Sequence, residues 1–292
     1  MVELDRVGVL GGGTMGAGIA HALLAAGIPV TLVESDATAM ARAMDRVAAS
    51  LDAAAARGKL AEPPAALLAR LTGACDPAAV AGANLVIEAV PESVELKRAV
   101  LAAAEAAVEP AAEAAAGRGP GPVLATNTSS MSVDELAAGL RRPDRFVGMH
   151  FFNPVPASGL VEVVHGAASA PAAVRLAREV AALLGKESIE VADSPGFATS
   201  RLGVLLGLEA IRMVEEGVAG VEDIDRAMVL GYRHPMGPLR LGDLVGLDVR
   251  LGVAEYLQGK FGERFAPPRL LREMVADGRL GKKAGQGFYR WD

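Results

Sequence analysis

The sequence predicts an α/β protein with an N-terminal Rossmann-type doubly wound sheet and a C-terminal all-α domain. Two observations support this fold class. From Val7 to about residue 191, short apolar runs alternate with segments of helical periodicity, which is the pattern of βα units around a parallel sheet. From Phe197 onward the alternation stops, and the later segments are all typical of helices. We therefore expect two domains, residues 1–187 and residues 188–292.

Composition places the chain among globular proteins. It has 292 residues, of which 51% are hydrophobic and 22% charged, with a net charge of −6. This charge gives no reason to expect a nucleic acid or a membrane surface as a partner. The single cysteine, Cys75, cannot form an internal disulfide, and the apolar start contains too many glycines for a signal or membrane segment. We expect a soluble, cytoplasmic protein without a bound metal.

The first motif is a glycine-rich turn, GGGTMG, between the apolar run at residues 7–10 and a helix expected at residues 17–26. In such a G-x-G-x-x-G pattern the first glycine allows a tight turn, and the second lets the backbone approach a pyrophosphate. The third glycine lets helix and strand pack closely, and the helix N-terminus favours an anion. The cofactor-binding residues predicted here are Gly11, Gly13, Thr14, Met15 and Gly16.

An acid closes the second expected strand, residues 29–33. Glu34 follows Gly16 by 18 residues, where a carboxylate accepts hydrogen bonds from both hydroxyls of an adenosine ribose. The same carboxylate would repel a 2′-phosphate, and the next residues, Ser35 and Asp36, bring no arginine. We therefore expect NAD, and not NADP. A glycine-rich turn without a ligand would leave the acid as a coincidence.

A strand expected at residues 84–90 is followed by Glu92, and Lys97 lies five residues later on a helix. This pair either faces the cofactor crevice or forms an exposed ion pair.

The next expected strand, residues 123–126, runs into a cluster of hydroxyl side chains. Such a cluster lies on the ligand edge of an open parallel sheet, and it is also an ordinary helix N-cap. We expect Ser129 to face the ligand and Ser130 or Ser132 to cap the helix.

The other expected elements are helices at residues 39–57, 67–71, 133–140 and 171–184, a strand at residues 188–191, and helices at residues 198–216, 221–230, 239–257 and 268–277. The Ala/Gly/Pro tract at residues 111–122 ends in an expected surface loop. A helical domain of this size, rich in Leu, Val and Met, often buries a face against a second subunit. We expect a homodimer through the C-terminal domain.

Two polar residues interrupt the apolar stretch VGMHFFNPVPASGLVEVV, residues 147–164. Under period-two alternation Glu162 lies either on an exposed edge or in the interior, where it must be paired. His150 is its candidate partner if the two runs form antiparallel strands. A carboxylate that holds one imidazole nitrogen fixes the tautomer and raises the basicity, as a general base requires. The alternative is a core histidine bonded to a structural acid.

Taken together, these residues resemble the NAD-dependent 3-hydroxyacyl-CoA dehydrogenase family, especially its short bacterial members, the 3-hydroxybutyryl-CoA dehydrogenases. The resemblance spans nearly the whole chain and is carried by VGVLGGGTMGAGIA, IEAVPE, ATNTSSMSV, RFVGMHFFNPVP with LVEVV, DSPGF, AMVLGYRHPMGPLRLGDLVGLD and GKKAGQGFY. It implies reversible oxidation of a (S)-3-hydroxyacyl-CoA thioester to the 3-oxoacyl-CoA, with NAD as acceptor.

The resemblance also implies roles for single residues. His150 would be the general base, Glu162 its orienting partner, and Ser129 a hydrogen-bond donor to the 3-oxygen of the substrate. Family positions that contact the cofactor fall on Glu92, Lys97, Ser129, Asn153 and Lys283, and those that contact the CoA moiety fall on Ser50 and Arg57, where an arginine replaces the more familiar lysine.

One position departs from the family pattern. Ser200 stands where the family usually has an asparagine that helps to bind the acyl-CoA. A serine keeps a hydroxyl donor but loses reach and one donor hydrogen. We expect a retained but altered role for Ser200.

Two other functions stay open at this point. The protein could be a dehydrogenase of a free hydroxy acid or sugar acid, similar to the gulonate dehydrogenases that resemble λ-crystallin, and inhibition by CoA analogues would discriminate. It could also be a non-catalytic NAD-binding sensor or structural protein. Only Ser200 favours the second reading, because His150, Glu162 and Ser129 are all present. His165 and His234 are expected to be non-catalytic.

Overall fold

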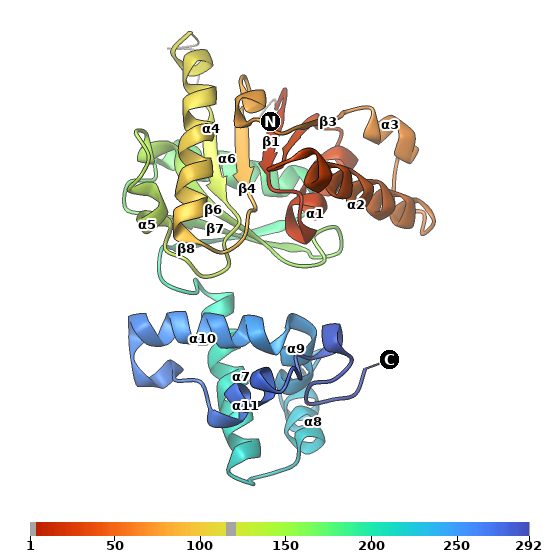
Figure 1. Cartoon of the computed structure of the whole chain (residues 1–292), viewed down its shortest axis with the longest axis vertical. Coiled ribbons are helices and arrows are strands. Elements are labelled where there is room, and N and C mark those ends of the chain that lie inside the picture. The colour runs from red at the N-terminus through yellow and green to blue at the C-terminus, as the bar shows by residue number, and fades with distance from the viewer. Residues whose placement is uncertain (1–3, 115–120, 292) are drawn as a thin grey trace. The chain divides into compact units, whose positions relative to one another are not determined.

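The structure is a computed structural model that describes residues 4–114 and 121–291. The chain divides into two compact units, Met1–Ser194 and Pro195–Asp292. Strands and helices alternate along the first unit, and the second is built from helices (Figure 1). The predicted fold class, a Rossmann-type sheet followed by an all-α part, is confirmed.

An eight-stranded sheet forms the centre of the first unit, in the order β3-β2-β1-β4-β5-β6-β7-β8. Strands β1 to β6 pair in parallel, β7 is antiparallel to β6, and β8 is parallel to β7. The strand order reverses at β1 and β4, where open sheets of this kind bind dinucleotides beyond the carboxyl ends of the strands. The strands are β1 Val7–Leu10, β2 Val30–Val33, β3 Leu71–Ala74, β4 Leu85–Glu88, β5 Val123–Thr126, β6 Phe146–Phe151, β7 Leu160–His165 and β8 Glu187–Ala192.

The helices of the first unit are α1 Thr14–Ala25, α2 Ala37–Ala55, α3 Pro64–Leu68, α4 Val94–Ala114, α5 Val133–Ala137 and α6 Pro171–Leu183, with short 3-10 turns at Pro77–Val80 and Pro143–Arg145. Two of them begin at side-chain caps. The Asp36 carboxylate accepts from the backbone N–H of Ala39 at the start of α2, and the Ser132 hydroxyl accepts from that of Glu135 at the start of α5. The prediction that Ser130 or Ser132 is the cap is thus confirmed for Ser132.

Alternation along the strands sends side chains to two faces of the sheet. Val9, Ile87 and Met149 belong to one core, in which they pack with residues of α1, α2 and α6. Glu88 and His150, each one residue further along the same strand, therefore point to the opposite face. The polar residues of β4 and β6 thus share one face, and α1, α2 and α6 cover the other.

Strand β3 was missed by the sequence analysis, which extended a helix to residue 71. Helix α3 ends at Leu68, and β3 begins at Leu71. Only Leu71 is buried in this strand, and Thr72 and Gly73 are exposed. The segment lacks the alternation that marks a strand, and it becomes one because it pairs with β2 at the edge of the sheet.

The division between the units also differs from the expected one. A boundary after residue 187 would fall inside β8, which pairs with β7 over its full length. Strand β8 therefore belongs to the first unit, and the units divide after Ser194. Helix α4 continues to Ala114, and residues 115–120 of the expected surface loop lie outside the described residues.

The second unit contains α7 Thr199–Glu215, α8 Val221–Gly231, α9 Pro238–Val245, α10 Leu247–Phe261 and α11 Arg269–Ala276, with 3-10 turns at Glu263–Phe265 and Lys282–Ala284. The prediction of one helix over residues 239–257 is wrong. Gly246 has φ +105, which is unfavourable for other residues, and it separates α9 from α10. Within residues 4–114 and 121–291, no helix combines the length and apolar character needed to cross a membrane.

Candidate active site

The glycine-rich turn has the geometry that its sequence predicts. Gly11 has φ +92, and a Cβ at Gly16 would overlap the carbonyl oxygen of Gly11. Apart from Gly13 itself and its two chain neighbours, no residue of the described chain lies within 4 Å of the place that a Cβ of Gly13 would take. The turn is therefore tight at Gly11, closely packed at Gly16 and open at Gly13, and this arrangement fits the approach of a pyrophosphate to the start of α1.

Glu34 is held against this turn. Its Oε1 accepts from the backbone N–H of Gly12 at 2.7 Å, and its Oε2 accepts from the N–H of Ser35 at 3.1 Å. Arg46 on α2 was not predicted to lie at this turn, and its Nη1 donates to the carbonyl oxygen of Gly12 at 3.3 Å. Because Arg46 lies a helical segment beyond Glu34, inspection of the residues next to the acid could not find it.

Lys97 is the centre of a buried ion-pair network at the ends of β4 and β5. Its ammonium donates to Glu88 Oε1 at 2.7 Å and to the Val90 carbonyl at 3.1 Å, and it lies 3.2 Å from Glu92 Oε2. Three acceptors therefore use the three hydrogens of the ammonium. The Lys97 side chain is 2% exposed and that of Glu92 is 45% exposed. Lys97 is thus no member of an exposed ion pair, and it holds Glu92 at the sheet edge.

Glu88 is a polar residue of this edge that the sequence analysis did not single out. It is fully buried, and it also accepts from Thr126 Oγ1 at 2.6 Å and from the Val90 N–H at 2.7 Å. The run NLVIEAV could have indicated a role for Glu88, because an acid inside a buried strand must have a partner.

Glu92 in turn gathers the hydroxyl cluster after β5. Its Oε1 accepts from Thr128 Oγ1 at 3.0 Å and from the Ser129 N–H at 3.2 Å. Ser129 is partly exposed at this edge, and Ser130 is buried. The structure thus brings Glu92, Lys97 and Ser129 together.

His150 and Glu162 are paired directly across β6 and β7, as the predicted antiparallel arrangement requires. His150 Nδ1 lies 2.6 Å from Glu162 Oε2, and the Phe152 ring centroid lies 4.3 Å from that of His150. Glu162 is 0% exposed and His150 is 6% exposed. A carboxylate at this distance places the imidazole hydrogen on Nδ1, which leaves the lone pair on Nε2. The pair can therefore accept a proton at Nε2.

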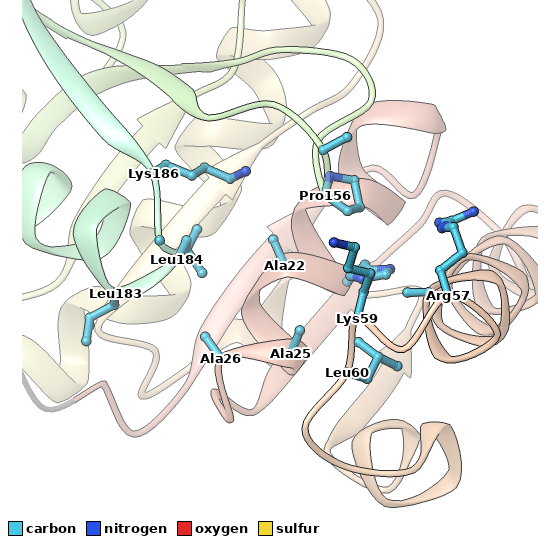
Figure 2. A pocket seen from close by; sticks show the side chains of 14 residues that line it. Ala22, Ala25, Ala26, Arg57, Lys59, Leu60, Pro156, Leu183, Leu184 and Lys186 are labelled. Carbon is cyan, nitrogen blue, oxygen red and sulfur yellow. The ribbon is translucent and has the colours of Figure 1, made fainter.

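Ser50 and Arg57 lie on the other face of the sheet, near a pocket of about 620 Å³ that Arg57 lines. The Ser50 hydroxyl is 2.8 Å from Nδ1 of His21, a buried histidine of α1 that also lines the pocket. The walls come from α1, the end of α2, the loop between β6 and β7, and the end of α6 (Figure 2). No role for His21 could be predicted from the sequence, because only the fold brings α1 beside the end of α2.

Comparison with known protein families shows to which family this chain belongs. Residues 6–194 match the NAD binding domain of 3-hydroxyacyl-CoA dehydrogenase, and residues 196–291 match the C-terminal domain of the same family. The chain belongs to the 3-hydroxyacyl-CoA dehydrogenase family. It is therefore an oxidoreductase of the NAD-dependent 3-hydroxyacyl-CoA dehydrogenases, and NAD is its cofactor.

Individual relatives agree with this membership. The chain is 42% identical over 291 residues to a 3-hydroxybutyryl-CoA dehydrogenase of Mycobacterium tuberculosis, a match that covers 99% of both chains. The crystal structure of M. tuberculosis FadB2 has a TM-score of 0.92 at 41% identity and covers 100% of both chains. That of (S)-3-hydroxybutyryl-CoA dehydrogenase PaaH1 from Ralstonia eutropha has a TM-score of 0.90 at 39% identity, with 99% and 100% covered.

The remaining residues implied by the 3-hydroxyacyl-CoA dehydrogenase pattern lie elsewhere. Asn153 is exposed in the loop after β6 and forms a cis peptide bond with Pro154. Lys283 and Ser200 belong to the second unit, where Lys283 Nζ donates to Asp248 Oδ2 at 2.6 Å and Ser200 lies in the first turn of α7. Their contacts with cofactor and substrate stay predictions.

The buried histidine of the pocket predicts a dependence of stability on pH. Burial, and then the positive charges of Arg57 and Lys186, lower the pKa of His21 below its ordinary value of 6.5. The unfolded chain binds a proton at this side chain below pH 6.5, and the folded chain does so only at lower pH. The free energy of unfolding should therefore fall as the pH drops from 6.5 toward the folded pKa, and be unaffected by His21 above that window.

Replacement of His21 by Gln, which keeps a hydrogen-bonding group near Ser50, should make this fall shallower. Urea denaturation above and below pH 6.5 measures the effect in wild type, in His21→Gln and in the control variant His165→Gln. If the free energy of unfolding falls equally steeply with pH in wild type and in His21→Gln, the effect cannot be assigned to His21.

Proposed function

We propose that the protein catalyses the reversible oxidation of a (S)-3-hydroxyacyl-CoA to the 3-oxoacyl-CoA, with NAD as hydride acceptor. One observation carries the proposal: a buried His150–Glu162 pair, 2.6 Å apart, on a sheet with a dinucleotide-type glycine turn in a chain of this family. The M. tuberculosis relative named 3-hydroxybutyryl-CoA dehydrogenase, identical at 42% of positions, supports the thioester as substrate.

The residues at the glycine-rich turn and at the carboxyl ends of the neighbouring strands fit NAD. Gly13 leaves open space for the pyrophosphate, and the start of α1 offers unpaired backbone N–H groups to it. Glu34 closes β2 where the ribose hydroxyls would bind, and Glu92 lies at the same edge. When bound, NAD supplies the acceptor for the hydride from C3 of the substrate.

His150 takes the proton of the 3-hydroxyl group at Nε2. Glu162 accepts the hydrogen on Nδ1, so it holds the imidazole in the productive tautomer and stabilises the imidazolium once the proton has moved. Because Glu162 is fully buried, water does not compete for this hydrogen bond. In the reducing direction the same imidazolium returns the proton to the 3-oxygen.

Ser129 donates a hydrogen bond to the same 3-oxygen. It follows β5, which is the neighbour of β6 in the sheet, and Glu92 holds its backbone N–H. A donor in the segment after one strand and a base on the neighbouring strand can thus act on one oxygen atom. Asn153 and Lys283 contact the cofactor, and Ser200 contributes a hydroxyl donor to the acyl-CoA in place of the usual asparagine.

The CoA moiety binds near Ser50 and Arg57. Three cationic side chains, Arg57, Lys59 and Lys186, line the adjoining pocket, and the chain as a whole carries a net charge of −6. A local excess of positive charge on an acidic protein favours the phosphates of CoA over a neutral substrate.

The protein acts in the cytoplasm as a homodimer, and the two copies associate through the C-terminal helical unit, Pro195–Asp292. The observation that supports a second copy as partner is a set of exposed large apolar side chains on α7, α9 and α10: Leu202, Leu205, Leu206, Leu241, Leu244, Val245 and Val249. The exposed thiol of Cys75 suits a reducing compartment.

The test is NADH oxidation with acetoacetyl-CoA, beside acetoacetate and, with NAD, a free sugar acid. Turnover with the thioester alone is the expected result, because only the thioester carries the phosphates that the pocket attracts. Equal turnover of a free acid would replace the proposed substrate class. NADH binding without turnover of any of the three would remove the catalytic assignment.

A further inference from the structure

Lys186 is a buried cation of this pocket, and its contacts with the rest of the protein have no part in the roles above. It is 8% exposed and follows Gly185, which lies two residues beyond the end of α6. Its ammonium donates to the carbonyl oxygens of Val155 at 2.6 Å and Ser158 at 2.5 Å. Within the described parts of the chain it has no ion pair with a carboxylate, and burial lowers the pKa of Lys186. Two of its three hydrogens are thus used by backbone carbonyl groups, and no carboxylate among the described residues is its counter-ion.

The two carbonyl groups belong to the loop that joins β6 to β7, residues 152–159. This loop starts directly after the strand of His150 and ends before that of Glu162, and it carries Asn153. The loop crosses to the face covered by α1, where Val155 is buried and packs closely on Gly18. A Cβ added at Gly18 would lie 2.9 Å from the Cβ of Val155. Lys186 therefore holds the segment that sets the positions of the paired strand ends.

The same side chain faces the pocket that Arg57 lines. Lys186 and Lys59 extend toward this pocket from opposite sides, and Pro156 of the loop also lines it (Figure 2). The residues that line it include His21 and these three cations and, among those described, no acid. A volume of about 620 Å³ is large enough for a nucleotide-sized ligand. An anionic group in the pocket would accept the third hydrogen of Lys186 and supply the missing counter-charge.

We propose that Lys186 is a positioning residue that couples a phosphate group bound in this pocket to the loop between the strands of His150 and Glu162. The ligand class is a nucleotide phosphate, and the inference rests on the proposed function in taking the CoA moiety of the substrate as its source. A bound phosphate stabilises the ammonium of Lys186, and the ammonium then holds residues 155 and 158 more firmly. Binding energy from a remote part of the substrate thereby orders the catalytic strands.

The coupling can be measured by supplying the nucleotide separately from the reacting group. S-acetoacetylpantetheine carries the thioester but lacks the nucleotide, and adenosine 3′,5′-bisphosphate carries the phosphates alone. With NADH saturating, so that the bisphosphate does not occupy the cofactor site, we expect the bisphosphate to raise kcat for the pantetheine substrate about 5-fold or more. Adenosine, which has no phosphate, should not activate.

Two variants separate coupling from binding. Lys186→Met should abolish the activation at every bisphosphate concentration, because it removes the link to the loop. Lys59→Met, the same substitution on an exposed lysine of the opposite wall, should raise the half-activating concentration and leave the maximal activation in place. Activation of Lys186→Met to the wild-type maximum would overturn the proposal, as would binding of the bisphosphate to wild type without activation.

A second readout does not depend on turnover or on a folded variant. Hydrogen exchange of the backbone amides at residue 155 and residues 157–160 in the wild-type NADH complex should slow when adenosine 3′,5′-bisphosphate is added. Unchanged exchange at saturating bisphosphate would overturn the coupling, even in an enzyme that turns over acetoacetyl-CoA. Protection of this loop in a protein that does not turn over acetoacetyl-CoA would instead support the coupling and reject the proposed substrate.

Discussion

Replacing His150 by Gln is expected to lower kcat for the reduction of acetoacetyl-CoA by about 10² to 10⁴ and to leave the affinity for NADH nearly unchanged. Glutamine is close to histidine in size and can keep a hydrogen bond to Glu162, but its amide does not bind a proton near neutral pH. The loss should therefore fall on proton transfer. Steady-state kinetics give the change in kcat, and a fluorescence titration with NADH gives the affinity.

The matched control for this substitution is His165→Gln. His165 ends β7, three residues after Glu162, and is partly exposed. Since it lies outside the His150–Glu162 pair, its replacement should leave kcat within about 2-fold, as substitutions away from a functional group usually do. Full turnover by His150→Gln would show that another group accepts the proton and would remove Glu162 from its orienting role as well.

Replacing Lys97 by Met is expected to lower the free energy of unfolding by about 3–5 kcal/mol. The side chain of Lys97 is 2% exposed and that of Glu88 is 0% exposed, so the substitution leaves a buried carboxylate without its counter-ion. The remaining hydrogen bonds to Glu88, from Thr126 and the Val90 N–H, do not neutralise its charge. Urea denaturation followed by far-UV circular dichroism measures the loss.

Two further variants test the cause. Adding Glu88→Gln to Lys97→Met should restore part of the stability, because a neutral amide no longer needs a counter-ion. Arg142→Met breaks the ion pair between Arg142 and Asp144, two side chains that are 41% and 43% exposed. This substitution should lower the free energy of unfolding by less than about 1 kcal/mol. A loss for Lys97→Met as small as that for Arg142→Met would mean that the buried pair contributes nothing beyond a surface pair.

The parts of the site that could be predicted share one property: their partners are near in sequence or in strand register. The glycine turn and Glu34 belong to one βαβ unit, so spacing alone relates them. His150 and Glu162 lie on adjacent strands joined by a short loop, and alternation put both polar residues in an interior that demands a partner. Local rules therefore sufficed for these residues.

The residues that were missed act through contacts between distant segments. Glu88 lies on β4, and its partners Lys97 and Thr126 come from α4 and β5. His21 meets Ser50 only because α1 and α2 pack together, 29 positions apart in the chain. Strand β3 forms because it pairs with the edge of β2. The residues of β3 alternate too weakly between apolar and polar for a strand to be predicted from them.

The sequence by itself determined the fold class, the dinucleotide motif, and the pairing of His150 with Glu162, because strand periodicity and turn geometry depend on neighbouring residues. Only the tertiary structure decided where the charges without local partners go. Lys97 became the counter-ion of a buried acid, and Lys186 came to connect a basic pocket with the loop between the strands of His150 and Glu162. Charges act through space over several ångströms, so their partners are set by the packing of helices on the sheet and not by distance along the chain.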